Sequence, residues 1–154
     1  MAAKATPSTR VGLAGSTSKL DALVIPVGVD WYALDVRAVR EVVTNPHVTD
    51  VPTAGASVLG VFNLRGDIVP LFDTGALLSL GPLPPCFFAA VVETAMGLAG
   101  LAASGVPEAV SLGEPTGPSD AEGTAGSYVV GTRVVTLLDL DALLAPVSAG
   151  GNPS

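Results

Sequence analysis

The sequence has few of the residues that carry out most enzyme chemistry. Its 154 residues include one cysteine, Cys86, and one histidine, His47. A single cysteine excludes an intramolecular disulfide and a cysteine-based metal cage, and a lone histidine has no second imidazole for a metal site. Cysteine–histidine catalysis would require Cys86 and His47 to meet in space. The sequence favours simpler interpretations: a small hydrophobic residue in a strand for Cys86 and a solvated loop residue for His47.

Basic residues are also scarce. After Lys19 there is no lysine and there are only four arginines, and the net charge is −7. A nucleic-acid-binding protein needs a basic surface that neutralises phosphates, so we expect no nucleic-acid partner. The longest apolar run, Cys86–Val92, is far shorter than the roughly 20 residues of a membrane-spanning helix. We therefore expect no direct membrane insertion, and a reducing, cytoplasmic location fits the single cysteine.

The remaining residues indicate one domain with two tails. Residues 1–19 are rich in Ala, Ser and Thr and predict a disordered N-terminal tail. Residues 20–145 predict the folded domain, and residues 146–154 a flexible C-terminal tail. The Gly81-Pro82-Leu83-Pro84-Pro85 segment is the strongest internal boundary. It divides the domain into a first subdomain, about 20–81, and a second, about 86–145, each expected to form a β-barrel.

Short β-type runs separated by turn residues fill both subdomains. A helical turn that runs into a strand is expected from Val36 to Val43, and a loop without periodicity from Ser111 to Ser127. Capped helices are expected at about 74–80 and 139–144. The expected strands are 23–27, 31–34, 58–64, 68–72, 87–92, 98–103, 128–130 and 134–138, and residues 106–110 follow the strand 98–103.

An internal repeat links the two subdomains. Ile68–Leu78 and Val134–Leu144, 66 residues apart, are identical at six of eleven positions, where chance would give about one. A shift of 67 also aligns Glu41 with Glu108. Each half alone is about 60 residues and marginal in stability. The repeat therefore predicts a mainly β fold: two five-stranded barrels that share a hydrophobic core, with short helices.

Two carboxylates hold equivalent positions in this repeat, Asp73 and Asp139. Paired carboxylates can serve in general acid–base catalysis. Both, however, stand directly before an expected helix, where a carboxylate caps the first-turn amides. Capping is the better explanation. A small-molecule-binding or hydrolytic enzyme that uses Asp73, Asp139 or Cys86 stays the alternative.

Arg65 is the most informative charge in the chain. It lies between two apolar strands, 58–64 and 68–72, in a turn where Gly66 supplies a positive φ. With Glu41, which stands among valines, it could form a bidentate ion pair. The alternative is two separate surface charges, and spacing alone does not decide between them. Gly131 stands where the repeat would place a second arginine, and this asymmetry indicates a role in function for Arg65 and Glu41.

These residues resemble a known family. VLGVFNLRGDIVPLFD, preceded by WYALDVRAVREVV and VTDVP, closely resembles the CheW-like domain of bacterial chemotaxis coupling proteins. FFAAVVETAMGLAGLAASGVPEAV and VVTLLDLDALL in the second half are also similar to it. The resemblance implies two SH3-like barrels and a non-enzymatic adaptor without a cofactor or bound metal. It implies two partners, the cytoplasmic tip of a chemoreceptor and the regulatory domain of a CheA-type histidine kinase, and association with membrane receptor arrays through them.

The resemblance also implies a partner-binding surface. The family's positions for partner contacts fall on Val39, Glu41, Gly60, Asn63 and Arg65. One departure from the family pattern is Asp73-Thr74-Gly75, where Asp-Leu-Arg is usual, so contacts from that arginine are absent. A CheW-like module that assembles with its own copies is a further alternative.

Overall fold

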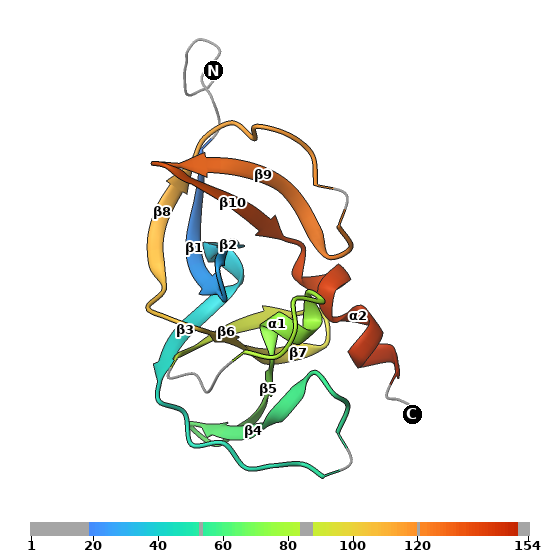
Figure 1. Cartoon of the computed structure of the whole chain (residues 1–154). Helices are drawn as coiled ribbons and strands as arrows, with labels where there is room; N and C mark the ends of the chain where they lie inside the picture. Colours follow the sequence, from blue (N-terminus) through green and yellow to red (C-terminus); the bar gives the residue numbers. More distant parts are fainter. Residues whose placement is uncertain (1–18, 53, 84–87, 120, 151–154) are drawn as a thin grey trace, which may run out of the picture.

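The computed structural model of the chain describes residues 19–52, 54–83, 88–119 and 121–150 (Figure 1). Cys86, the prolines at 84 and 85, residues 1–18 of the expected N-terminal tail (1–19) and residues 151–154 of the expected C-terminal tail (146–154) lie outside the described residues. In the part that is described, no helix is long and apolar enough to cross a membrane.

Short strands make up most of this structure. The strands are β1 (Leu20–Val27), β2 (Asp30–Asp35), β3 (Val39–Thr44), β4 (Val58–Leu64), β5 (Asp67–Phe72), β6 (Phe88–Thr94), β7 (Gly97–Ala103), β8 (Glu108–Leu112), β9 (Thr124–Val130) and β10 (Arg133–Leu138). The helical segments are η1 (Val36–Ala38), α1 (Thr74–Leu77) and α2 (Leu140–Gly150). The expected helical turn that leads into a strand is confirmed as η1 followed by β3.

Two five-stranded sheets form the body of the molecule. Sheet 1, the upper one in Figure 1, has the order β8-β1-β2-β10-β9, and sheet 2, the lower one, has the order β3-β6-β7-β5-β4. Each sheet therefore contains strands from both halves of the chain. The first hairpin of each half, β1–β2 or β6–β7, pairs with strands of the other half. The sheets thus differ from the expected division, in which 20–81 form one barrel and 86–145 the other.

The exchange of hairpins follows from how each sheet is completed. β10 runs parallel to β2, and β5 runs parallel to β7. A tight turn joins only antiparallel strands, so a parallel neighbour must arrive through a long connection. η1 carries the chain from sheet 1 to sheet 2, and residues 104–107 carry it back. The returning segment is held against β1, because the Ser104 amide donates to the Pro26 carbonyl at 2.9 Å.

The internal repeat is visible in this arrangement. β4, β5 and α1 take the places beside sheet 2 that β9, β10 and α2 take beside sheet 1. Two isolated bridges repeat as well, Thr49 with Val61 and Gly117 with Ser127. Each bridge joins the segment after one edge strand to the opposite edge strand. Both sheets thereby close into barrels in the same way and hide their open edges.

The main apolar core lies between the two sheets. Its largest cluster includes Ile25 and Leu34 from sheet 1, Val92 and Leu101 from sheet 2, and leucines of α2. A smaller cluster belongs to each sheet alone. Burying one side chain of this size contributes about 1.5–3 kcal/mol relative to leaving it exposed. Each barrel therefore depends on the other, and the expected fold class, two five-stranded SH3-like barrels with a shared core, is confirmed.

Several expected boundaries are wrong, and α1, expected at about 74–80, already ends at Leu77. The loop expected at 111–127 is shorter, because β8 continues to Leu112 and β9 already begins at Thr124. The small residues at 124–127 lack an apolar alternation, yet they pair with β10. The helix expected to end at Leu144 continues to Gly150 and includes Pro146. A proline removes one backbone donor, but its fixed φ near −65° is itself helical.

Candidate partner-binding site

Glu41 and Arg65 meet across the seam of sheet 2. Glu41 lies in β3, one edge strand of that sheet, and Arg65 lies in the turn after β4, the opposite edge strand. Arg65 Nη1 donates to Glu41 Oε1 at 2.6 Å. The two residues therefore form an ion pair and are not separate surface charges. The contact is a single hydrogen bond rather than the expected bidentate pair.

The two partners differ in exposure. The Arg65 side chain is 72% exposed, whereas that of Glu41 is 26% exposed. Glu41 shares the inward-facing side of β3 with Val39 and Val43, as the alternating burial of this strand shows. The hydrogen bond with Glu41, and then the attraction between the charges, raises the pKa of Arg65 above its usual value. Arg65 is therefore a permanent cation that presents most of its planar donor group to solvent.

The turn that carries Arg65 has an unusual backbone. Arg65 and Gly66 have φ values of 49° and 96°, and they join β4 to β5 as a two-residue turn. Two consecutive positive φ values are typical of a type I′ hairpin turn, whose twist matches that of the strands. Asn63 Oδ1 accepts a hydrogen bond from the Gly66 amide at 3.0 Å. Asn63 thus holds the turn that aims Arg65 at Glu41.

Gly60 is required for close packing of the backbone. It is buried in β4 with a φ of 151°. A Cβ atom there would lie 2.4 Å from the Thr49 carbonyl oxygen and 2.6 Å from Val48 Cγ1. Only glycine lets residues 48 and 49 lie against β4, where Thr49 forms its bridge with Val61. Gly60 is therefore too buried to contact a partner, and it affects the site only through the shape of the barrel edge.

Val39, the fifth residue of the expected surface, opens β3. It is half-buried, packs against the core shared by the two sheets and pairs with Val92 of β6. A bulge follows it, because Glu41 pairs with the next residue back, Val91. Arg40, the residue inserted at the bulge, is exposed and pairs with Glu93. The structure thus brings Glu41, Asn63 and Arg65 together at one end of the seam, with Val39 two residues along the same strand face.

A second arginine–glutamate pair, which the sequence did not predict, lies at the corresponding seam of sheet 1. Glu108 belongs to β8, the edge strand equivalent to β3, and accepts a hydrogen bond from Arg133 Nη2 at 3.0 Å. The guanidinium of Arg133 also lies 4.2 Å from the centroid of the Trp31 ring, a cation–π contact. The Arg133 side chain is only 28% exposed. Each barrel therefore has an ion pair at its seam.

This second pair corrects the inference drawn from Gly131. The repeat places Gly131 opposite Arg65, but the first barrel takes its arginine from two residues further on, at the start of β10. Asymmetry in the presence of an arginine is therefore not an argument for the function of Arg65. The asymmetry that the structure shows is one of exposure, since Arg133 is covered by Trp31 and Arg65 faces solvent.

The carboxylates considered for catalysis are helix caps. Asp73 is buried; its Oδ1 accepts from the Ala76 amide at 3.1 Å and from the Leu83 amide at 3.3 Å. Asp139 Oδ1 accepts from the Ala142 amide at 3.2 Å. Across the described ranges, no group of three His, Cys, Asp or Glu side chains could hold a metal ion. The capping explanation accounts for both aspartates.

Comparison with known proteins agrees with these features. Residues 21–147 match the CheW-like domain family. The chain belongs to this family. It is 33% identical over 64 residues to the chemotaxis protein CheW of Treponema pallidum (strain Nichols), a stretch that covers 42% of this chain and 38% of that protein. It is 28% identical over 143 residues to the chemotaxis protein CheW of Klebsiella aerogenes, 86% of each chain.

The CheW-like fold is also found among solved structures. The scaffolding protein TtCheW from Thermoanaerobacter tengcongensis superposes with a TM-score of 0.71 over 79% of this chain and 89% of that one, at 23% identity. At this identity the match concerns the fold. Together with the family match, it identifies a CheW-like chemotaxis scaffold protein, of a family whose members are adaptors rather than enzymes.

Proposed function

We propose that this CheW-like domain is a non-enzymatic adaptor that couples chemoreceptors to a CheA-type histidine kinase in a chemotaxis or chemosensory pathway. Its partners are the cytoplasmic tip of the receptor and the regulatory domain of the kinase. The protein works in the cytoplasm and joins membrane receptor arrays through these partners. The observation that carries the proposal is the ion pair of Glu41 with a largely exposed Arg65, at the edge of a fold that belongs to the family.

The surroundings of Arg65 suit a protein interface. Ile68, 64% exposed, lies directly across β4–β5 from Asn63, and Leu59 on β4 is 38% exposed. Interfaces draw most of their binding energy from a few residues, among which arginines and large apolar anchors are common. Arg65 with Ile68 beside it provides both on one hairpin. We assign the kinase-binding contact to this hairpin, with Glu41, Asn63 and Gly60 shaping it and Val39 extending it along β3.

Binding of a kinase regulatory domain to the Arg65→Ala variant tests the proposal. The affinity is expected to fall by about tenfold, measured by calorimetry at fixed salt. Arg37→Ala is the matched control, because it removes the same charge from a side chain that is 81% exposed and paired only with Asp35. Equal affinities for the Arg65→Ala variant and the unmodified protein would overturn the assignment.

One observation favours a second candidate, a module that assembles with its own copies. Val129 and Val134 lie opposite each other on β9 and β10 and are 55% and 63% exposed. Paired apolar side chains on the outside of a hairpin can bind another protein surface. Light scattering separates the candidates: growth of the assembled mass without any kinase domain supports self-assembly, and a constant monomer mass supports the adaptor.

A further inference from the structure

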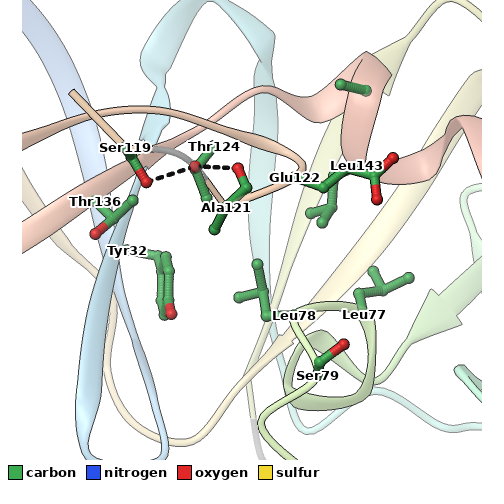
Figure 2. A pocket seen from close by; sticks show the side chains of 11 residues that line it. Tyr32, Leu77, Leu78, Ser79, Ser119, Ala121, Glu122, Thr124, Thr136 and Leu143 are labelled. Atoms are coloured by element: carbon green, nitrogen blue, oxygen red, sulfur yellow. Dashed lines mark hydrogen bonds between the residues drawn. The ribbon is translucent and has the colours of Figure 1, made fainter.

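A pocket beside the two helices is separate from the Glu41–Arg65 site. Its volume is about 330 Å³, and its lining comes from both halves of the chain. Figure 2 shows Tyr32 and Thr136 on one side and Leu77, Leu78 and Leu143 on the other. Residues 119, 121, 122 and 124 form its rim. None of the residues assigned to the seam pairs lines this pocket.

The rim is held in place by its own hydrogen bonds. Ser119 Oγ and Thr124 Oγ1 lie 2.6 Å apart, and Thr124 Oγ1 also donates to the Ala121 carbonyl (Figure 2). The next residue after the bonded carbonyl is Glu122, an exposed residue that belongs to the pocket lining. A rim tied together in this way keeps its shape when a ligand arrives, which lowers the entropy lost on binding.

Two hydroxyl-bearing residues line the pocket from neighbouring strands. Tyr32 of β2 and Thr136 of β10 are direct partners in the parallel pairing of these strands. Burial, and to a smaller extent the charge of Asp30, raises the pKa of Tyr32. Like an ordinary tyrosine, it is protonated at neutral pH and can either donate or accept a hydrogen bond.

The charge of the pocket is negative and is not offset within the lining. Glu122 is the charged residue among the lining side chains, and none of them is basic. The four arginines in the described ranges are each paired with a carboxylate elsewhere, at Asp35, Glu41, Glu93 and Glu108. None of these four arginines therefore neutralises Glu122. The pocket combines an apolar wall with an acidic rim.

We infer that this pocket receives the side chain of one arginine or lysine from a partner protein. The aliphatic stem lies along Leu77, Leu78 and Leu143, while the cationic head meets Glu122 at the rim. A volume of about 330 Å³ is at the small end for ligand pockets, which suits one side chain. The pocket is open at its rim rather than enclosed, so the main chain of the partner can stay outside.

This inference is independent of the kinase contact assigned to Arg65, and its test uses the chain alone. The ¹⁵N-labelled full chain is titrated with Nα-acetyl-arginine amide, and amide shifts are followed by NMR. Saturable shifts are expected for Thr124, Thr136 and Leu143, at millimolar concentrations. Nα-acetyl-norleucine amide, which has the stem without the charge, is expected to bind more weakly.

Glu122→Gln is expected to weaken the affinity for the arginine compound about fivefold, whereas Glu114→Gln, which removes the same charge outside this pocket, leaves that affinity unchanged.

Three outcomes would overturn the inference. The first is no saturable shift with either the arginine compound or its lysine equivalent. The second is equal binding of the arginine and norleucine compounds, which would mean that the pocket does not recognise the cation. The third is much tighter binding of free arginine than of the blocked compound, because a site that prefers the free amino acid recognises a small metabolite and not a side chain in a protein.

Discussion

Arg65 Nη1 lies 2.6 Å from Glu41 Oε1, and this one contact joins the two edge strands of sheet 2. The same pair is proposed to face the kinase, so it has two possible roles: closing the barrel and binding a partner. Because the Arg65 side chain is 72% exposed, its ion pair contributes little to the free energy of unfolding. The exposed guanidinium is better suited to contact with another protein.

Exchanging the two charges separates these roles. Arg65→Glu or Glu41→Arg alone places like charges at the seam, so each single variant should melt at a lower temperature. The double variant restores the ion pair and should recover the melting temperature. It should not recover kinase affinity, because the kinase domain then contacts a carboxylate at position 65 in place of the guanidinium. Recovery of both the melting temperature and the kinase affinity by the double variant would show that the ion pair serves only to close the barrel.

Gly60→Ala should destabilise the fold without any effect that is specific to binding. The added Cβ would lie 2.4 Å from the Thr49 carbonyl oxygen, on a backbone whose φ of 151° already disfavours side chains. We expect the free energy of unfolding to fall by about 2–4 kcal/mol in urea titrations. Gly55→Ala is the matched control, because its Cβ would meet nothing within 4 Å, and a change within about 0.5 kcal/mol is expected. A stable Gly60→Ala variant that no longer binds kinase would instead place Gly60 in the interface itself.

Local features of the fold could be predicted from the sequence, but long-range pairings could not. Turn residues and apolar runs predicted most strands, and the aspartates at 73 and 139 predicted the helix starts that their capping bonds confirm. The exchange of β1–β2 and β6–β7 between the sheets leaves no local pattern, because either hairpin could pair with either half. A 66-residue repeat shows that two units exist, not which strands each unit contains.

The candidate site shows the same limit. Their positions in the sequence identified Glu41 and Arg65 as candidates but could not show that they touch. The two residues are 24 positions apart, and their contact crosses the seam of the barrel. The pair of Glu108 and Arg133 could not be predicted from the repeat, because Arg133 lies two residues beyond Gly131, the position equivalent to Arg65. The one available signal was the alignment of Glu108 with Glu41 at a shift of 67.

Arg37 should control the acid titration of Asp35. The hydrogen bond from the Arg37 side chain, opposed in part by burial, lowers the pKa of Asp35 below its ordinary value of 3.8. A lowered pKa in the folded state stabilises the protein above about pH 3.8, and this stabilisation is lost as the pH falls through the folded value. In NMR titrations, Arg37→Ala should move the pKa of Asp35 back toward 3.8.

A small lowering should persist in that variant, because the backbone amide of residue 37 still donates to Asp35 Oδ1, at 2.9 Å in the parent structure. Arg40→Ala, which removes a charge that pairs with Glu93 instead, serves as the control and should leave the pKa of Asp35 unchanged. An unchanged Asp35 titration in Arg37→Ala would mean that the guanidinium is not the cause of the lowered pKa.

Arg133 should stabilise the first barrel more than Arg65 stabilises the second. Arg133→Ala loses the contact with the Trp31 ring and the hydrogen bond to Glu108, so the free energy of unfolding should fall by about 1–2 kcal/mol. Trp31 is the single tryptophan of the chain, so its fluorescence reports the contact directly. The emission should shift in Arg133→Ala and stay constant in Arg37→Ala. Constant Trp31 emission in both variants would contradict the cation–π contact.

Neither half of the chain should fold without the other. A fragment that ends at residue 83 contains β1 and β2 but lacks β8, β9 and β10, which complete sheet 1. The fragment from residue 84 onward contains β6 and β7 but lacks β3, β4 and β5. Each fragment alone should give the poorly dispersed amide spectrum of an unfolded chain, and an equimolar mixture should regain the dispersed spectrum of the intact protein. A well-dispersed spectrum from either fragment alone would show that a half can close its own barrel, and would contradict the exchange of hairpins on which both seam pairs depend.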